Sequence, residues 1–332
     1  MNNLQLIFFL IISSFILLFL FNSIGYKFKL LDLPSSRKIH SKPTPYIGGI
    51  VLGVIYLISI FFVEFSNNDY KFILLFSFIV SLVGLLDDRI NLSVTAKLVF
   101  QSLPILVLIF NYNFVVTNLS TFGNNLLTLG PLSHIFTILC VYLLINATNY
   151  IDGIDGFASS IFISSFVLIF IMLPEKNIDI YRYTLIILIP TFIFVIFNLS
   201  FFSLPKIFLG DSGSLLLGFI LSFTLISIFN NFEIHAAKLC WCVPIIVYDF
   251  LYVNLTRIRS KKNIFKPTKE HVQHMLLQKT KSTYYSNFIG FLINLLMGLF
   301  GFIIFDKLGE IFSINLFILT FVFYFYFRLK FL

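Results

Sequence analysis

Carboxylates occur in three short polar stretches of a chain that is otherwise apolar. Asp87 and Asp88 lie in "GLLDDRINLS", Asp152 and Asp155 in "NYIDGIDGF", and Asp211 in "IFLGDSGSLLLGF". Acidic side chains in an apolar, membrane-like setting are costly, and they tend to mark ion or substrate sites. If the three stretches converge, their like charges repel one another. The sequence therefore predicts a cation among these carboxylates.

The residue types around the carboxylates indicate which cation fits. Asp and Asn oxygens predominate, no cysteine is near them in sequence, and histidines occur only in a later loop. These ligands suit a hard cation such as Mg²⁺, with Mn²⁺ as the alternative, which keeps waters and binds substrate phosphates besides protein oxygens. Gly153, Gly156, Gly210 and Gly213 let the backbone approach a ligand and present N–H groups to phosphate oxygens. We expect a metal ion beside a phosphate group.

Helix capping is the structural explanation of the same residues. "GDSGS" would cap the helix that follows it, and for one motif alone capping explains the acid as well as a ligand site does. Three such clusters on one side of the membrane favour a shared site over three separate caps.

Basic residues form the other part of the predicted site. "RKIHSKPTPYIGG" contains Lys42, and "RIRSKKNIFKPTKEHVQHMLLQ" contains Lys269, His271 and His274. The two histidines are three residues apart, so they share one face if this segment is helical. We interpret these residues as cationic anchors for phosphates. Two alternatives stay open: charge that only sets membrane orientation, and a histidine pair that binds a transition metal.

The elements that must position these residues are predicted to be transmembrane helices. Hydrophobic residues make up 58% of the chain and charged residues 11%, a composition typical of a multi-span membrane protein. A span needs about 20 apolar residues, and we place approximate spans at 4–24, 46–63, 71–86, 94–110, 132–148, 157–173, 180–198, 213–229, 236–253, 284–304 and 311–327. We therefore expect an all-α, polytopic membrane protein with about 11 transmembrane helices, forming a single integral-membrane domain over residues 1–332.

Lysine and arginine residues are distributed unevenly between the two sets of connections. Eighteen fall in one set and five in the other, and the positive-inside rule makes the richer set cytoplasmic. This places the N-terminus outside, the C-terminus in the cytoplasm, and the acidic stretches at the cytoplasmic face. The net charge of +8 then reflects topology and attraction to anionic membrane lipid. Nucleic acid is not an expected partner.

Other polar and reactive residues are expected to be structural. We interpret the amide-rich residues 111–130 as an external loop. The acids predicted on the outer side are interpreted as solvated turn residues: Glu64, Asp69, Glu175, Asp179, Glu233, Asp306 and Glu310. The three cysteines fall within predicted spans and are interpreted as inert packing residues: Cys140, Cys240 and Cys242.

Taken together, the motifs resemble those of the polyprenyl-phosphate N-acetylhexosamine-1-phosphate transferases, bacterial membrane enzymes of glycosyltransferase family 4. The likeness covers nearly the whole chain: "RKIHSKPTPYIGG", "GLLDDR", "NATNYIDGIDGFA", "FLGDSGSLLLGF", "PIIVYD" and "HVQH" occur in the family's order and on the predicted side. Each motif alone is weak, whereas together they are specific.

The resemblance implies a reaction at the cytoplasmic face of the bacterial inner (plasma) membrane. Undecaprenyl phosphate attacks the sugar-bearing phosphorus of a UDP-N-acetyl sugar, UDP-GlcNAc or a related sugar, and UMP is released. Such a step starts a cell-surface polysaccharide such as the O-antigen of lipopolysaccharide or another cell wall polymer. The choice of sugar and polymer, and whether the protein forms a homodimer, are left open.

The resemblance also implies roles for individual residues. Asn149 and Asp211 would hold the metal, Asp152, Gly153 and Asp155 would face the nucleotide, Phe208 would stack on uracil, and Lys42, Lys269, His271 and His274 would contact substrate phosphates. Asp87 and Asp88 would be catalytic. Because neighbouring helical residues point about 100° apart, one of this pair is expected to position the lipid phosphate while the other is held by Arg or Lys.

The chain departs from the family pattern at several positions. Asn91 stands where the family often has an acid, Gln273 replaces a histidine, and Thr268 with Lys269 replaces an Asp-Arg pair. These changes leave the predicted metal site intact. They argue against a firm choice of sugar and against a bidentate phosphate contact, since Lys is a point charge where Arg is a fork. "PTPYIGG" in place of "GTPTMGG" argues against muramoyl-pentapeptide as substrate.

The alternative class is a membrane transporter of an ion or a phosphorylated solute. Transporter acids are expected near the bilayer midplane, on broken helices related by repeats. Here the acids are predicted at one face, and no repeat is visible. The sequence therefore favours the transferase.

The predicted topology can be tested by cysteine labelling. In a background without other cysteines, Lys262→Cys should resist an impermeant thiol reagent in intact cells, because residue 262 is predicted to be cytoplasmic. Asn118→Cys should react, because residue 118 is predicted to be outside. Labelling in the reverse order would contradict the predicted orientation.

Overall fold

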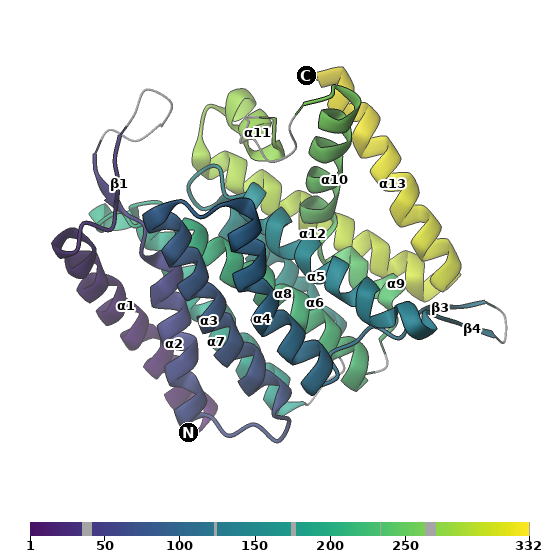
Figure 1. Cartoon of the computed structure of the whole chain (residues 1–332), viewed down its shortest axis with the longest axis horizontal. Helices are drawn as coiled ribbons and strands as arrows, with labels where there is room; N and C mark the ends of the chain where they lie inside the picture. The colour runs from purple at the N-terminus through teal and green to yellow at the C-terminus, as the bar shows by residue number, and fades with distance from the viewer. Residues whose placement is uncertain (35–41, 123–124, 174–176, 233, 263–269, 332) are drawn as a thin grey trace. The chain divides into compact units, whose positions relative to one another are not determined.

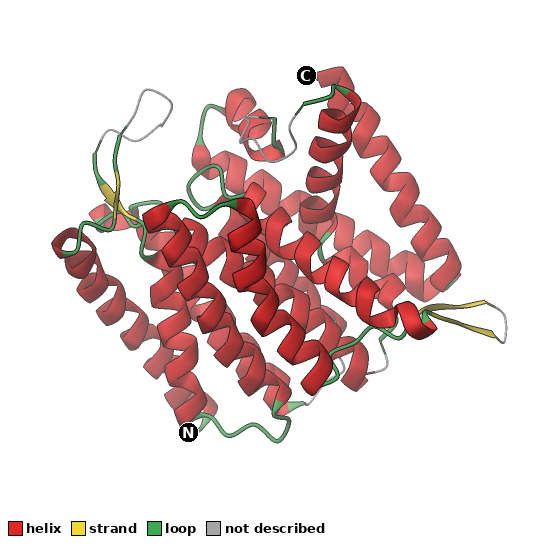
Figure 2. Cartoon of the chain, in the orientation of Figure 1, coloured by secondary structure: helices red, strands yellow, loops and turns green. Residues whose placement is uncertain are grey.

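The computed structural model describes residues 1–34, 42–122, 125–173, 177–232, 234–262 and 270–331. The described chain is almost entirely helical, as expected, with two short two-stranded hairpins (Figures 1 and 2). It divides into two compact units, Met1–Pro104 with Pro174–Ile220 and Ile105–Leu173 with Leu221–Leu332. Each unit combines two stretches of chain, and the single domain over residues 1–332 stays a prediction.

The first unit is built on three long helices that enclose a fourth, shorter one. Its elements are α1 (Asn3–Lys27), β1 (Leu31–Asp32), β2 (Thr44–Pro45), α2 (Gly48–Phe62), α3 (Asp69–Ile90), α7 (Ile178–Asn198) and η2 (Phe201–Ser203), with the first parts of α4 (Val94–Asn111) and α8 (Gly210–Phe232). Helix α2 packs against α1, α3 and α7. Its buried Tyr56 hydroxyl donates to the carbonyl oxygen of Ile187 on α7, at 3.2 Å. A buried polar contact thus joins α2 to α7.

The second unit is organised around the long helix α12. Its elements are β3 (Asn118–Phe122), β4 (Asn125–Thr128), η1 (Gly130–Leu132), α5 (Ser133–Tyr150), α6 (Phe157–Met172), α9 (Ala236–Leu239), η3 (Cys240–Cys242), α10 (Pro244–Arg259), α11 (Val272–Thr280), α12 (Thr283–Leu308) and α13 (Glu310–Phe331), with the last parts of α4 and α8. A Cβ added at Gly298 or Gly301 would overlap Leu168 on α6 or Trp241 on η3. These two glycines therefore allow α12 to lie directly against its neighbours.

Long apolar helices make this a multi-pass membrane protein. Within the described residues, 8 helices are long and apolar enough to cross a membrane, or 9 if the pair Ala236–Cys242 and Pro244–Arg259, bent by 82°, counts as one span. Helices α2 and α6, with 15 and 16 residues, fall short of the length of about 20 residues that a span needs. All eleven predicted segments contain a helix, but the count of eleven spans and the orientation stay predictions.

A buried asparagine supports the bend in the ninth apolar segment. Pro244 opens α10, and the neighbouring backbone N–H of Ile245 has no acceptor within its own helix. The Oδ1 atom of Asn294 on α12 accepts this N–H at 3.3 Å. Its Nδ2 lies 3.2 Å and 3.3 Å from the hydroxyls of Ser164 and Ser165 on α6. The backbone N–H that the bend leaves without a helical acceptor is therefore hydrogen-bonded within the same unit.

Two predictions for the outer side differ from the structure. Residues 118–128, expected as part of a loop, contain the antiparallel hairpin of β3 and β4. Asp179, expected as a solvated turn residue, is only 5% exposed, and its Oδ2 accepts the N–H groups of Ser66 and Asn67 at 2.7 Å and 2.9 Å. The carboxylate thus ties the turn before α3 to the start of α7. Glu175 and Glu233 lie outside the described residues.

Asp179→Ala should destabilise the protein. The change leaves two partly buried N–H groups without their acceptor, which costs about 1–3 kcal/mol. Thermal unfolding in detergent should therefore begin at a lower temperature. Asp306→Ala is the control, because Asp306 is 60% exposed in its ion pair with Lys238 and exposed pairs contribute about 0–1 kcal/mol. Equal unfolding temperatures for the two variants would contradict the assigned role of Asp179.

Candidate functional site

In the first unit, one lysine bridges two of the predicted site carboxylates. Asp87 lies in the last turn of α3, Lys97 in the first turn of α4, and Asp211 in the first turn of α8. The Nζ atom of Lys97 lies 2.7 Å from Oδ2 of Asp87 and 2.5 Å from Oδ2 of Asp211. The lysine and Asp87 side chains are 16% and 11% exposed, whereas Asp211 is 34% exposed. Asp211 is thus the more accessible of the two carboxylates.

The neighbouring carboxylate, Asp88, binds backbone instead of a cation. Its Oδ1 accepts the N–H of Asp211 at 3.0 Å, and its Oδ2 accepts the N–H of Ser212 at 3.2 Å. These N–H groups belong to the first turn of α8, which has no intrahelical acceptor for them. Asp88 therefore caps α8 from another helix, and an acid at this position is favoured by the helix dipole. Asp88 therefore caps a helix, whereas Asp87 and Asp211 form the carboxylate cluster around Lys97.

Asp87 and Asp88 have different partners, as expected for neighbouring residues of one helix. Asp87 is held by Lys97 and also accepts the N–H of Leu92 with its Oδ1 at 2.8 Å, so the expected cation beside one member is present. Asp88 faces α8 and holds the backbone on which Asp211 sits. This geometry gives Asp88 a positioning role, while the catalytic roles of both residues stay predictions.

Two glycines allow α3 and α8 to meet at this point. Gly210 has a φ of +71°, and a Cβ there would lie 2.7 Å from Oδ2 of Asp88 and 3.0 Å from the carbonyl oxygen of Tyr46. A Cβ at Gly84 on α3 would overlap the backbone of Ser212. Glycine is therefore required both for the turn into α8 and for the contact that lets Asp88 reach it.

Phe208 and Lys42 lie on the loops around this cluster. The Phe208 N–H donates to the carbonyl oxygen of Pro45 at 2.8 Å, and Lys206 Nζ lies 5.2 Å from the centre of the Phe208 ring. Lys42 is exposed, just before β2. Burial, with the charge of Asp88 as a further cause, raises the pKa of the Tyr46 phenol, so this hydroxyl is protonated at neutral pH. Stacking of Phe208 on uracil stays a prediction.

In the second unit, side chains from two helices hold the loop after α5. Gln273 on α11 donates from Nε2 to the carbonyl oxygen of Tyr150 at 2.9 Å, and Asn287 on α12 donates from Nδ2 to that of Asp155 at 2.8 Å. Asp152 and Asp155 are half-buried in this loop. Its backbone is thus fixed at both ends. The departure from the family pattern at Gln273 is explained, since the amide has a structural task.

The same loop lies against one of the two predicted histidines. A Cβ at Gly153 would lie 2.8 Å from Nε2 of Gln273 and 2.8 Å from Nε2 of His274. Gly153 and His274 were predicted separately as substrate-binding residues, and the structure brings them together. Asn149, at the end of α5, lies before this loop in the same unit. Its pairing with Asp211 as a metal ligand stays a prediction.

The histidine pair is divided between two environments. His271 precedes α11 as its N-cap residue and is 7% exposed, with Nδ1 2.7 Å from Oδ2 of Asp249 on α10. His274 lies in the first turn of α11, near Gly153. The shared helical face was predicted only if the segment is helical, and α11 begins directly after His271, whose side chain contacts Asp249. Lys269 falls outside the described residues.

Sequence reasoning assigned no individual role to three charged residues that are buried or half-buried in the structure. Lys97, Asp249 and Arg328 make the ion pairs of the two clusters, and Asp249 and Arg328 are 0% exposed. Lys97 and Asp249 lie within predicted spans, and Arg328 directly follows one. A charge in or beside an apolar span was the available signal, since such charges require partners.

The donor atoms around Lys97 fit a hard cation. Oδ2 of Asp87 and Oδ2 of Asp211 already share one positive group. Among the described residues, no three His, Cys, Asp or Glu side chains are grouped as a closed metal site. Carboxylate oxygens of this kind suit Mg²⁺, which takes further ligands from water and substrate phosphates. The same set does not fit a transition metal held by the protein alone.

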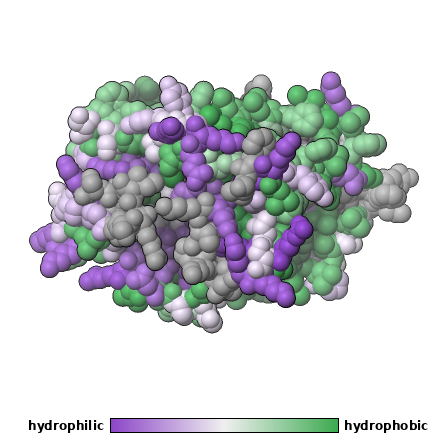
Figure 3. All heavy atoms as spheres, turned by 90° about the horizontal axis from the view of Figure 1, so that it is seen from above, coloured by the Kyte–Doolittle hydropathy of each residue, from purple (hydrophilic) through white to green (hydrophobic). Residues whose placement is uncertain are grey.

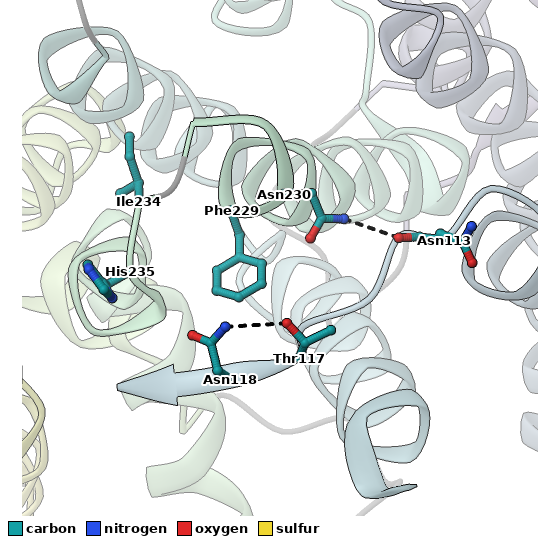
Figure 4. A pocket seen from close by; sticks show the side chains of 7 residues that line it. All are labelled: Asn113, Thr117, Asn118, Phe229, Asn230, Ile234 and His235. Atoms are coloured by element: carbon teal, nitrogen blue, oxygen red, sulfur yellow. Dashed lines mark hydrogen bonds between the residues drawn. The ribbon is translucent and has the colours of Figure 1, made fainter. Parts of the chain in front are cut away.

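Two surface features complete the description. Figure 3 shows a face on which hydrophilic side chains gather among hydrophobic ones. A cavity of about 420 Å³ in the second unit is lined by Asn113, Thr117, Asn118, Phe229, Asn230, Ile234 and His235 (Figure 4). At least one amide side chain of this lining is hydrogen-bonded to the backbone, because Asn230 donates to the carbonyl oxygen of Asn113 at 3.2 Å. It contains none of the predicted site residues.

Gly84→Ala should disturb the contact between α3 and α8. The new methyl group would overlap the backbone of Ser212, which cannot move aside as a side chain can, and overpacking of this kind costs about 1–3 kcal/mol. The matched control is Gly153→Ala, where the nearest atoms are the ends of the Gln273 and His274 side chains. Thermal unfolding in detergent should show the larger loss for Gly84→Ala. A loss no larger than that of the control would contradict the close packing.

Comparisons with known proteins agree with the motifs. The profile of glycosyl transferase family 4 matches residues 70–229, which include Asp87, Asp88, Asp152, Asp155 and Asp211. A probable undecaprenyl-phosphate N-acetylglucosaminyl 1-phosphate transferase of Bacillus subtilis (strain 168) is 30% identical over 266 residues, covering 76% of this chain and 71% of that protein.

Enterobacterial relatives show the same extent of similarity. The undecaprenyl-phosphate alpha-N-acetylglucosaminyl 1-phosphate transferase of Escherichia coli (strain K12) is 28% identical over 278 residues, covering 80% of this chain and 75% of that protein. The enzyme of the same name from Yersinia pestis is 26% identical over 275 residues, 81% of this chain and 75% of that protein. The chain therefore belongs to glycosyl transferase family 4.

Proposed function

We propose that the protein transfers an N-acetylhexosamine-1-phosphate from a UDP-sugar to undecaprenyl phosphate and releases UMP. The observation that carries the proposal is the cluster of Asp87, Lys97 and Asp211, which lies within the matched family region and joins two carboxylates to one cation. The relatives in B. subtilis and E. coli are named for a transfer of this kind with N-acetylglucosamine, which supports UDP-N-acetylglucosamine or a related N-acetyl sugar as donor.

The reaction exchanges one phosphoanhydride bond for another. An oxygen of the lipid phosphate forms a new P–O bond to the sugar-bearing phosphorus of the UDP-sugar. The P–O bond between that phosphorus and the bridging oxygen of UMP breaks, and UMP leaves with the electron pair. A phosphate monoester has a second pKa of about 6, so the attacking group is mostly dianionic at neutral pH. The mechanism therefore needs charge compensation and alignment more than a strong base.

Asp211 is the residue we assign to the metal. When bound, Mg²⁺ supplies positive charge to the diphosphate and to the developing charge of the transition state. Asp88 holds the backbone N–H groups of Asp211 and Ser212, which fixes the carboxylate at the start of α8. Lys97 keeps the Asp87 and Asp211 side chains together. The cluster thus presents one half-exposed carboxylate on a backbone that cannot easily shift.

Residues of the second unit are assigned to the anionic and nucleotide parts of the substrate. The loop with Asp152, Gly153 and Asp155 would face the nucleotide, and its fixed backbone suits that role. His271 and His274 would contact phosphate oxygens through charge-assisted hydrogen bonds. Lys42 and Phe208 of the first unit keep their proposed contacts with phosphate and uracil.

The membrane setting is proposed from the charge distribution. Eighteen of the 23 lysine and arginine residues fall on one set of connections, which supports a cytoplasmic active site in the bacterial plasma membrane. A UDP-sugar is available on that side. The transfer would then begin a cell-surface polysaccharide, of which the O-antigen is one example. A transporter, the alternative from sequence, has no observation in its favour among these residues.

The proposal is tested with the purified protein, undecaprenyl phosphate, Mg²⁺ and a panel of UDP-sugars, with UMP release as the readout. The wild-type protein should release UMP only when lipid phosphate and a UDP-N-acetyl sugar are both present. Asp211→Asn should remain folded but lose transfer at limiting Mg²⁺ by about a hundredfold or more, since loss of a metal ligand removes several kcal/mol of transition-state stabilisation.

Asp306→Asn is the matched control, because Asp306 is exposed and lies in the last turn of α12, in a segment that was predicted to be outer. It should transfer at the wild-type rate. Near-normal turnover of Asp211→Asn at limiting Mg²⁺ would contradict the metal assignment. No UMP release by the wild-type protein with any sugar would contradict the function.

A further inference from the structure

A buried carboxylate in the second unit lies beside His271 and belongs to no role assigned so far. Asp249 on α10 is 0% exposed. Its Oδ2 lies 2.7 Å from Nδ1 of His271. Its Oδ1 accepts the N–H of Val272 at 2.8 Å, the hydroxyl of Tyr324 at 3.1 Å and an N–H of Arg328 at 2.7 Å. One carboxylate thus receives four donors, two from α13 and two from the residues at the start of α11.

The division of these donors between the two oxygens restricts the histidine. Three donors occupy Oδ1, which leaves Oδ2 for the imidazole. A carboxylate only accepts hydrogen bonds, so the ring nitrogen facing Asp249 must carry the proton. The Nδ1 atom of His271 is therefore the donor, and Nε2 is the ring nitrogen available to another ligand. Tyr150 lies against the ring, with the two ring centres 5.4 Å apart.

The last helix of the chain holds this arrangement from the other side. Arg328 on α13 is 0% exposed, and its second terminal nitrogen donates to the carbonyl oxygen of Glu270 at 2.5 Å. Its guanidinium lies 4.5 Å from the centre of the Tyr252 ring. One guanidinium therefore binds both the carboxylate that faces His271 and the residue that precedes His271. Such a planar fork reaches two acceptors at once, which a lysine cannot do.

We propose that Asp249 is a positioning residue that fixes the orientation and the Nδ1–H tautomer of His271, and that Arg328 of α13 fixes Asp249 and Glu270 in turn. The inference rests on the proposed function, in which Nε2 of His271 meets a substrate phosphate. With Nδ1–H committed to Asp249, a second proton on Nε2 gives the imidazolium, which donates from Nε2 to that anion. Helix α13 lies beyond the matched family region of residues 70–229, so this support comes from outside it.

Asp249→Asn separates a positioning role from a merely structural one. The amide has almost the same shape, but only one of its two terminal atoms accepts hydrogen bonds. The Asn oxygen should remain where Val272, Tyr324 and Arg328 donate, which turns the NH₂ group toward His271. The ring should then change to the Nε2–H tautomer, because Nδ1 must accept from the amide.

The first measurement is the nitrogen spectrum of the full-length protein labelled with ¹⁵N-histidine. The chain has 5 histidines, and His271→Ala identifies the signal of interest. Wild-type protein should show a protonated Nδ1 at His271, and Asp249→Asn should show the proton on Nε2. The same Nδ1–H signal in both proteins would overturn the proposal. This readout does not depend on enzyme activity.

The second measurement is a double-mutant cycle on kcat/KM for UMP release. Asp249→Asn alone should lower kcat/KM by about tenfold to a hundredfold, the loss expected for a misplaced charge-assisted hydrogen bond. In the His271→Ala background it should change kcat/KM by less than about twofold, because coupled residues are not additive. Equal losses in both backgrounds would show that Asp249 acts on structure and not through His271.

Graded variants cover the case in which Asp249→Asn does not fold. Arg328→Lys keeps the charge but loses one of the two acceptors, so kcat/KM should fall by about tenfold. Tyr324→Phe removes the longest of the four hydrogen bonds to Asp249 and the bond that the Tyr324 hydroxyl accepts from Arg328 at 2.7 Å. It leaves the other three donors of Asp249 in place and should cost less. Asp306→Asn, an exposed acid of the same unit, should leave kcat/KM unchanged. Wild-type activity in Arg328→Lys would overturn the role of α13.

The two measurements separate the inference from the proposed function. If wild-type protein releases no UMP, the proposed function fails, while the nitrogen spectrum still decides the tautomer of His271. If wild-type protein is active and Asp249→Asn keeps both its tautomer and its kcat/KM, the inference fails and the function stands.

Discussion

Compensation of negative charge on partly or fully buried carboxylates is the constraint on which both units depend. In the first unit, Lys97 binds two carboxylates from different helices, and Asp88 receives the free N–H groups of α8. In the second unit, Asp249 receives four donors from its surroundings. At the fully buried Asp249, an unpaired charge would cost several kcal/mol. Each carboxylate therefore fixes the helix ends that supply its donors, and helix ends are where the candidate site residues lie.

Close backbone contacts make this compensation possible. For a carboxylate of one helix to reach the end of another, the backbones of the two segments must approach closely. Each such contact here has a glycine, which has no side chain to keep the backbones apart. Gly210 admits Asp88, Gly84 admits the backbone of Ser212, and Gly153 admits His274. The glycines of the acidic motifs are thus needed first for packing. Their proposed contact with phosphate groups is a second use of the same open backbone.

The sequence predicted the apolar helices and the polar motifs well, because both depend on local patterns. It did not predict the partners. Lys97 and Asp211 are 114 residues apart, and Asp249 and Arg328 are 79 apart, so no local pattern relates them. Asp179 lies in what reads as a solvated turn, yet its donors come from a turn more than 110 residues earlier. The sequence shows that a charge needs compensation, whereas the fold decides which donor provides it.

The central claim is that the group transferred is a sugar phosphate and not a sugar alone. Mass spectrometry of the lipid formed by the purified protein from undecaprenyl phosphate and UDP-N-acetylglucosamine tests this directly. The account predicts a lipid with two phosphates and one N-acetylhexosamine, together with one UMP for each lipid formed. A lipid with a single phosphate, formed with release of UDP, would contradict the account.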